Sequence, residues 1–473
     1  MKRDNGADRK RRRLGSRLRL ARCKKRLPQK FWLVAFCARS SKGRRCRSQS
    51  KNAVWSRPAC IRHHGYPKQQ FRHVKSPRVS SIDISEDGKS LNIFWEDEHK
   101  SQFHAIWLRH NCHCPSCRLD HNGMKSSIAE DIDLDIRLIG AEIEDNEILL
   151  LRWQHSNGHT HDGPIPLAWL RIRCRSPAAE AERTQARAMV FHEDKVIPEI
   201  EYEDVINSDL GLYEWMCHLG DRGICLVKNC PLVDGTVAKV AERIAPLQHT
   251  IYGETFEVKS MPQPINAAYS PVSLASHMDQ IMYECAPGLQ LLHCLQFDSY
   301  IVGGENTFTD IFELAHQLRE ERPDYFDTLT RVPVTMSTIH YNRDYPVHMT
   351  CKRPMLALNG NGELITIYWH PMLAEIDAVE ENIEPFFEAY KHFYLMVQNS
   401  QSVYKLRMVD GDMITFNNRR VLHGRAPYCN QRGLRLFQGT YLELSEFQSR
   451  LQVFHNLYGD GRLASRVGMA DWQ

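Results

Sequence analysis

The sequence has no apolar run long enough to cross a lipid bilayer, which requires about 20 consecutive apolar residues. The one apolar stretch near its start, Phe31 to Cys37, is far too short, and it lies too late for a secretory signal. Collagen-like repeats are absent, and 42% hydrophobic with 25% charged residues is the composition of an ordinary globular protein. At 473 residues the chain is long enough for two domains and a tail, and we expect no membrane partner.

Acidic residues are absent between Asp8 and Asp83. Residues 1–80 contain 26 of the 61 Lys and Arg residues but only two of the 57 acidic ones, so their net charge is +24 and that of the remainder is −20. An acidic body disfavours binding of nucleic acid by the folded part, so any such affinity would lie in the basic segment.

The basic segment, residues 1–79, has no hydrophobic period, which indicates a disordered or cleaved leader. Its long acid-free stretch is typical of a mitochondrial transit peptide, and a nuclear-localisation or nucleic-acid-binding arm is the competing interpretation. The odd number of cysteines, 15, and the lack of a secretory signal favour a reducing compartment. We expect a mitochondrial location, with the cytoplasm as the alternative.

Two domains are expected after the leader. Residues 80–176 have short alternating segments, such as Leu91 to Trp95, that predict a small β-rich domain, and Ala178 to Ala188 would be a connecting helix or linker. Residues 190–455 mix helical spacing with strands such as Leu289 to Phe297. This pattern predicts a mainly β fold with flanking helices, a distorted barrel or jelly roll.

A metal site is predicted in the second domain. His277 and Asp279 are two residues apart, so on an extended segment their side chains project from the same face. A third ligand is available at His423. Two imidazoles and one carboxylate leave three positions of the metal open, which suits Fe(II) that binds a chelating co-substrate and O2.

An arginine that could bind the co-substrate follows the third expected ligand in the sequence. Arg435 lies at the start of an expected strand, 12 residues after His423. A planar guanidinium can bind a carboxylate through two hydrogen bonds, as the far end of 2-oxoglutarate would require. The alternative is a surface arginine in a salt bridge.

A cysteine cluster predicts a second metal in the first domain. Cys112, Cys114 and Cys117 can converge on one tetrahedral Zn2+, and the site would be structural. The fourth ligand would come from the histidine-rich stretch that contains His155, His159 and His161.

The chain resembles the γ-butyrobetaine dioxygenase and trimethyllysine dioxygenase family of carnitine biosynthesis over roughly residues 80–455. The resemblance is carried by Trp107 to Cys117, by Pro287 to Cys294 with Gly303-Gly304, and by Asn418 to Arg425. It implies a double-stranded β-helix preceded by a zinc-binding domain, with His161 as the fourth zinc ligand. It also implies Fe(II), 2-oxoglutarate, O2 and ascorbate, and a homodimer.

The resemblance further implies a small substrate, a trimethylammonium acid, held by aromatic faces through cation–π attraction. The positions that it implies for the substrate are Tyr252, Phe256, Asn266, Tyr269 and Tyr441. Asn266 favours γ-butyrobetaine over trimethyllysine as the substrate. Two positions depart from the family pattern: Phe256 stands where the family has Trp, and Gln280 stands where the γ-butyrobetaine enzyme has Tyr. Trimethyllysine or another small molecule is the alternative substrate, and a non-catalytic ligand-binding or nucleic-acid-binding zinc protein is the alternative of another class.

Overall fold

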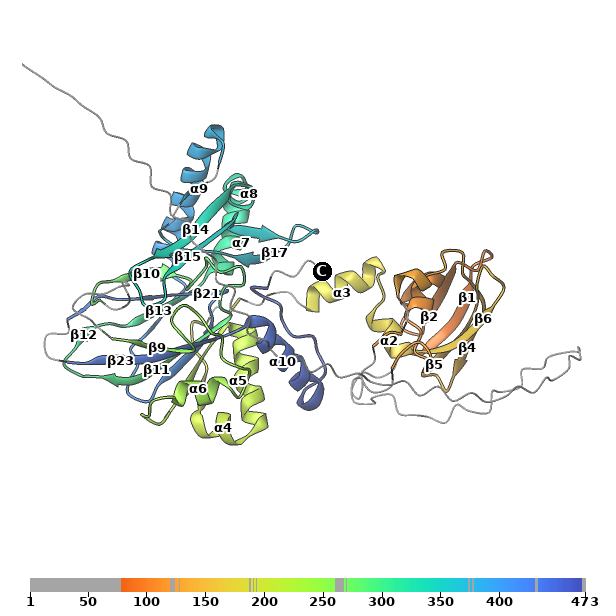
Figure 1. Ribbon diagram of the computed structural model, residues 1–473, viewed down its shortest axis with the longest axis horizontal. Coiled ribbons are helices and arrows are strands. Elements are labelled where there is room, and N and C mark those ends of the chain that lie inside the picture. Colours follow the sequence, from red (N-terminus) through yellow and green to blue (C-terminus); the bar gives the residue numbers. More distant parts are fainter. Residues whose placement is uncertain are drawn as a thin grey trace, which may run out of the picture. The chain divides into compact units, whose positions relative to one another are not determined.

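The computed structural model describes residues 78–119, 124–126, 128–186, 189, 191–192, 194–259, 268, 270–372, 375–376, 378–429 and 433–469 (Figure 1). The expected leader, residues 1–79, lies outside this part except for its last two residues. None of the helices described there has both the length and the apolar character that a membrane crossing requires.

The N-terminal domain is built on two antiparallel three-stranded sheets, β1-β2-β3 and β4-β5-β6. Alternate residues of β2 and β5, ending in Trp95 and Trp153, are buried in one hydrophobic core because successive side chains of a strand point to opposite faces. Its elements are β1 (Val79–Ile84), β2 (Ser90–Trp95), β3 (Lys100–His104), α1 (Ala105–His110), a 3-10 turn (Ala129–Asp131), β4 (Arg137–Glu144), β5 (Ile148–Gln154), β6 (Thr160–Pro166), α2 (Leu167–Ile172) and α3 (Pro177–Ala186).

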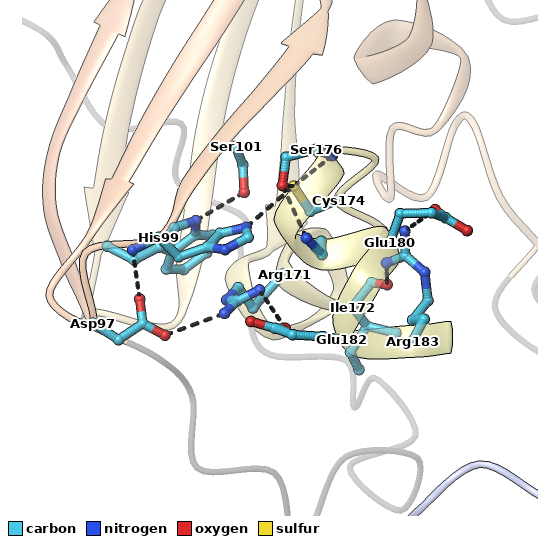
Figure 2. A network of polar contacts seen from close by, with 12 residues as sticks. Asp97, His99, Ser101, Arg171, Ile172, Cys174, Ser176, Glu180, Glu182 and Arg183 are labelled. Atoms are coloured by element: carbon cyan, nitrogen blue, oxygen red, sulfur yellow. Dashed lines mark hydrogen bonds and ion pairs between the residues drawn. The ribbon is translucent and has the colours of Figure 1, made fainter. Parts of the chain in front are cut away.

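A polar network joins the β2–β3 turn to the segment between α2 and α3 (Figure 2). His99 Nε2 lies 3.3 Å from Cys174 Sγ, and both side chains are buried. Arg171 of α2 forms ion pairs with Asp97 and Glu182, at 3.2 and 3.6 Å. The predicted connecting segment is therefore a helix that is anchored to this domain at its first turns.

Two larger sheets form the second domain, a six-stranded sheet (β7-β8-β20-β11-β23-β9) and a four-stranded sheet (β10-β21-β13-β19). Phe297, Phe416 and Phe437 of the first sheet share a core with Phe308 and Tyr404 of the second. The two sheets are thus packed face to face, and the expected jelly-roll fold is confirmed. The strands are β7 (Glu199–Glu201), β8 (Ile224–Lys228), β9 (Thr255–Val258), β10 (Leu274–His277), β11 (Leu289–Phe297), β12 (Val302–Gly303), β13 (Asn306–Asp310), β14 (Pro333–His340), β15 (Val347–Pro354), β16 (Leu356–Leu358), β17 (Leu364–Ile367), β18 (Glu375–Ile376), β19 (Val403–Leu406), β20 (Met413–Asn417), β21 (Val421–Arg425), β22 (Tyr428–Cys429) and β23 (Arg435–Leu442).

Helices pack on this sheet framework, and two of the described ones begin at a side-chain cap. Ser208 accepts a hydrogen bond from the Gly211 backbone N–H at 3.1 Å, and Asp310 accepts one from that of Phe312 at 3.0 Å. The helices are α4 (Tyr202–Asn207), α5 (Asp209–Arg222), α6 (Thr236–Ala241), α7 (Ile311–Glu321), α8 (Pro323–Arg331), α9 (Glu380–Asn399) and α10 (Leu444–Tyr458). Beyond the expected boundary at 455, Asn417 still donates to the Val467 carbonyl oxygen, so the domain includes these residues.

Candidate active site

Three side chains meet where β10 and β21 pair. His277 at the end of β10 is the cross-strand partner of His423 in β21, and Asp279 follows in the next turn. Asp279 Oδ1 lies 3.4 Å from His277 Nε2, and Asp279 Oδ2 lies 3.7 Å from His423 Nε2. One ligand atom from each residue lies within 4.8 Å of the others, so the three residues could bind one metal ion together. This donor set fits Fe(II) with open positions.

The protonation states of these side chains favour binding of a metal cation. Burial would raise the pKa of Asp279, but His423 and His277 more than offset this, and its pKa falls well below its usual range. Burial, assisted by repulsion from His277, lowers the pKa of His423 to about 3. At neutral pH an ionised carboxylate and a neutral imidazole are therefore available as ligands. Burial opposes the charge on His277 as well, but the hydrogen bond and attraction to Asp279 raise its pKa.

Other side chains fix the orientation of these ligands. His277 Nδ1 lies 2.8 Å from the Ala275 carbonyl oxygen, to which it donates, so Nε2 is left for a metal. Tyr441 Oη and Gln290 Nε2 donate to Asp279 Oδ2 at 2.7 and 2.9 Å. Asn418 accepts a hydrogen bond from the Asp279 backbone N–H at 2.8 Å and donates to its carbonyl oxygen at 3.1 Å.

Sequence reasoning did not assign a role to Gln290 or Asn418. A polar residue inside the apolar strand that begins at Leu289 was the available signal for Gln290. Asn418 is the first residue of a stretch that carries the family resemblance, which was the available signal, but its hydrogen-bond partners are distant in the sequence.

Arg435, at the start of β23, is buried, with only 5% of the residue exposed. It donates to Asn306 Oδ1 at 3.1 Å, and no carboxylate in the described part of the chain forms an ion pair with it. Burial, with repulsion from Arg425, lowers its pKa to about 10, so the group is still charged at neutral pH. A buried cation without a protein counter-ion fits the distant carboxylate of 2-oxoglutarate.

Three of the five expected substrate residues come together. The ring of Phe256 lies 5.1 Å from that of Tyr441 and 6.2 Å from that of Tyr252, measured between centroids. The phenol of Tyr441 also donates to Asp279, which places this aromatic group directly beside the metal ligands. Asn266 and Tyr269 lie outside the described residues.

The expected zinc ligands converge in the N-terminal domain. His161 Nε2 lies 3.4, 3.7 and 3.6 Å from the Sγ atoms of Cys112, Cys114 and Cys117. Contact with the thiolates of Cys114 and Cys117 raises the pKa of His161 to about 9. A Cys3His cluster of this size fits a structural Zn2+.

The other two candidates for the fourth zinc position are placed differently. His155 Nδ1 lies 3.3 Å from Asp133 Oδ2, and His159 is exposed. Gly163 is required beside the cluster, because a Cβ atom there would collide with Cys112 Sγ.

Comparison with known proteins agrees with this arrangement. A family model described as "Taurine catabolism dioxygenase TauD, TfdA family" matches residues 183–441, and one described as "Gamma-butyrobetaine hydroxylase-like, N-terminal" matches residues 82–163. The chain is 30% identical to a γ-butyrobetaine dioxygenase of Pseudomonas sp. (strain AK-1), over 80% of this chain and 96% of the relative. It is 29% identical to the Homo sapiens γ-butyrobetaine dioxygenase (81% and 99%) and 25% identical to a trimethyllysine dioxygenase of Meyerozyma guilliermondii (79% and 96%).

Proposed function

The chain belongs to the TauD, TfdA family of dioxygenases, and from this premise we propose that it hydroxylates γ-butyrobetaine to carnitine. It is an Fe(II)- and 2-oxoglutarate-dependent dioxygenase that acts on a small molecule. Fe(II) at this site would couple oxidative decarboxylation of 2-oxoglutarate, to succinate and CO2, with insertion of one oxygen atom into a substrate C–H bond.

The observation that carries the proposal is the juxtaposition of three metal ligands with an aromatic group. His277, Asp279 and His423 would hold the metal, and Tyr441 contacts both Asp279 and the ring of Phe256. Aromatic faces attract a trimethylammonium group by cation–π interaction and need no hydrogen bond from it. A C–H bond on the second carbon from the nitrogen, where carnitine has its hydroxyl group, would be held near the metal, and position decides which bond reacts.

Three further residues would position the co-substrate and a metal ligand. Arg435 would pair with the 5-carboxylate of 2-oxoglutarate, because it is buried and has no counter-ion among the residues that the structure describes. Gln290 and Tyr441 hold the carboxylate of Asp279, so that its free oxygen, Oδ1, faces His277. We also propose that the enzyme is a homodimer, which light scattering of the purified chain would test.

The test is an assay of the purified full-length protein with Fe(II), ascorbate, O2 and 2-oxoglutarate. Succinate is measured with γ-butyrobetaine, with trimethyllysine and with no substrate, and the product is identified by mass spectrometry. We expect substrate-dependent succinate and carnitine with γ-butyrobetaine. Succinate that depends on trimethyllysine instead would assign the other substrate, and no stimulation by either would contradict the proposal.

Two variants and a control make the assay specific. Asp279→Ala should abolish succinate formation because a metal ligand is lost, whereas Asp324→Ala, which changes an exposed carboxylate paired to Arg322, should leave it unchanged. Arg435→Gln should raise the KM for 2-oxoglutarate by at least about tenfold, since hydrogen bonds to charged groups contribute that much. Full activity of Asp279→Ala would show that the iron site is elsewhere.

A further inference from the structure

The first metal ligand lies on a strand at the edge of a sheet. His277 is the last residue of β10, and β10 is the outermost strand of the four-stranded sheet that the structure describes. On its inner side β10 is held by β21, where His277 pairs with His423. At its outer side an edge strand presents N–H and C=O groups that have no partner within the sheet. A ligand on such a strand keeps its place only if another part of the chain holds this side.

One residue, Trp369, provides both hydrogen bonds that hold the outer side. Its indole Nε1 donates to the carbonyl oxygen of Ser276 at 3.1 Å, and its own carbonyl oxygen accepts from the backbone N–H of Met278 at 3.1 Å. The Ser276 carbonyl belongs to the peptide group that precedes His277, and the Met278 N–H belongs to the one that follows it. Because peptide groups are planar, these two bonds fix the main chain from which the His277 side chain projects.

Trp369 is itself fixed by the long helix α9. The residue is fully buried, and its ring lies 5.5, 5.1 and 6.5 Å from the rings of Tyr390, Phe393 and Tyr394, measured between centroids. The hydroxyl of Tyr390 also donates to the Pro371 carbonyl oxygen at 2.8 Å, so α9 holds the chain on the C-terminal side of Trp369 as well. Interiors packed in this way leave a side chain little freedom to move.

We propose that Trp369 is a positioning residue for the metal, which acts by holding both peptide groups of His277. This inference rests on the metal site of the proposed function and does not depend on which substrate is used. The hydrogen bond from His277 Nδ1 to the Ala275 carbonyl oxygen sets the rotation of the imidazole, whereas Trp369 sets the place of the backbone that carries it. A displacement of about 1 Å in the reacting geometry can cost about 100-fold in rate.

The test is the variant Trp369→Phe, which keeps an aromatic ring and removes the indole N–H. The dissociation constant of Mn(II) is measured by calorimetry with 2-oxoglutarate and without O2, and we expect it to rise about tenfold, as for loss of a group that orients a metal ligand. The ratio of succinate to hydroxylated product is measured with the compound that the wild type hydroxylates. This ratio should exceed that of the wild type, because a displaced metal reacts without the substrate, and ascorbate then supplies the two electrons that the substrate does not give.

A second tryptophan provides the matched control. Trp215 of α5 is fully buried in the same domain, and its indole N–H has no partner in the described part of the chain. Trp215→Phe therefore removes the same atoms from a buried site without breaking a hydrogen bond, and it should keep the Mn(II) affinity and the product ratio of the wild type. Phe393→Leu loosens the packing around Trp369 but keeps the indole N–H, so its Mn(II) affinity should decrease by a smaller factor.

The outcomes distinguish this inference from the proposed function. Unchanged Mn(II) affinity in Trp369→Phe, or an equal loss in Trp369→Phe and Trp215→Phe, overturns the positioning role and leaves the proposed function in place. If Trp369→Phe does not fold, Phe393→Leu decides, and an affinity equal to that of the wild type overturns the role. A wild type that binds Mn(II) but hydroxylates neither candidate substrate overturns the proposed function, while the affinities still decide the role of Trp369. A wild type that binds no Mn(II) overturns both.

Discussion

The phenol of Tyr441 donates one of the two side-chain hydrogen bonds that Asp279 Oδ2 accepts. Tyr441→Phe removes the hydroxyl that donates to Asp279 Oδ2 and keeps the ring that stacks on Phe256. Loss of a group that orients a metal ligand typically costs 10- to 100-fold in metal affinity. We expect Mn(II) to bind Tyr441→Phe about 10- to 100-fold more weakly by calorimetry.

A buried tyrosine remote from the metal ligands provides the control for that measurement. Tyr202 accepts a hydrogen bond from Lys239 Nζ at 3.2 Å, and its hydroxyl contacts no metal ligand. Tyr202→Phe should bind Mn(II) as the wild type does. An unchanged affinity in Tyr441→Phe would show that Gln290 alone is sufficient to orient Asp279.

His293 of β11 is fully buried, and neither ring nitrogen has a partner in the described structure. Burial lowers its pKa from 6.5 to about 4. The unfolded chain therefore binds a proton at higher pH than the folded chain, so stability is full above about pH 6.5 and falls as the pH decreases toward 4. Integration of this linkage gives a loss of about 2 kcal/mol at pH 5.

The variant His293→Leu removes that titration while keeping an apolar side chain in line with Leu289 and Leu291, which face the same core. Between pH 7.5 and pH 5, the free energy of unfolding in urea should decrease by about 2 kcal/mol less for the variant than for the wild type. Equal decreases would mean that His293 is protonated in the folded protein.

At the residue scale, the sequence predicted which side chains meet where metal binding allows only a few residue types. The spacing of His277 and Asp279 predicted a shared face, and the structure brings His423 to them as the cross-strand partner of His277. Gln290 and Asn418 could not be assigned, because their roles arise from hydrogen bonds to Asp279 across 11 and 139 residues. Such contacts are set by the register of strands, which local patterns do not determine.

At the scale of secondary-structure elements, zinc would join α1 to β6 in the N-terminal domain. The cysteines follow α1, and His161 lies in β6. Cys114→Ser should lower the zinc content of the purified protein, measured by mass spectrometry of metals, and should increase hydrogen exchange in α1 and β6. A small domain gains folding energy from such a metal, so its local stability should decrease as well.

Cys174 is a matched control because it is a buried cysteine of the same domain whose sulfur contacts His99 instead of the zinc cluster (Figure 2). Cys174→Ser should keep the full zinc content. Loss of zinc in both variants would indicate a general unfolding of the domain, and retention of zinc in Cys114→Ser would exclude Cys114 as a ligand.

Secondary-structure elements were predictable where their apolar side chains are buried. β11 coincides with the strand expected over Leu289 to Phe297, because Leu289 and Leu291 recur at strand spacing and both are buried. The hairpin of β14 and β15 was not predicted. The residues of β15 alternate between apolar and polar from Val347 to Lys352, which is the pattern of a half-buried strand, so the signal was present although most of these residues are partly or fully exposed.

At the scale of the whole molecule, charge is divided between a basic leader of +24 and an acidic remainder of −20. Every element of the described fold begins at Val79 or later. Removal of residues 1–77 should therefore leave kcat/KM unchanged in the succinate assay. A large loss would show that the leader contributes to the active enzyme.

We propose that residues 1–79 direct the protein to mitochondria. The segment is rich in arginine and has no acidic residue after Asp8, as is typical of transit peptides. Fused to a fluorescent protein, it should produce mitochondrial fluorescence, and replacement of its arginines by glutamine should abolish import because the positive charge is lost. Nuclear fluorescence would favour a nuclear-localisation arm instead, and diffuse fluorescence would place the enzyme in the cytoplasm.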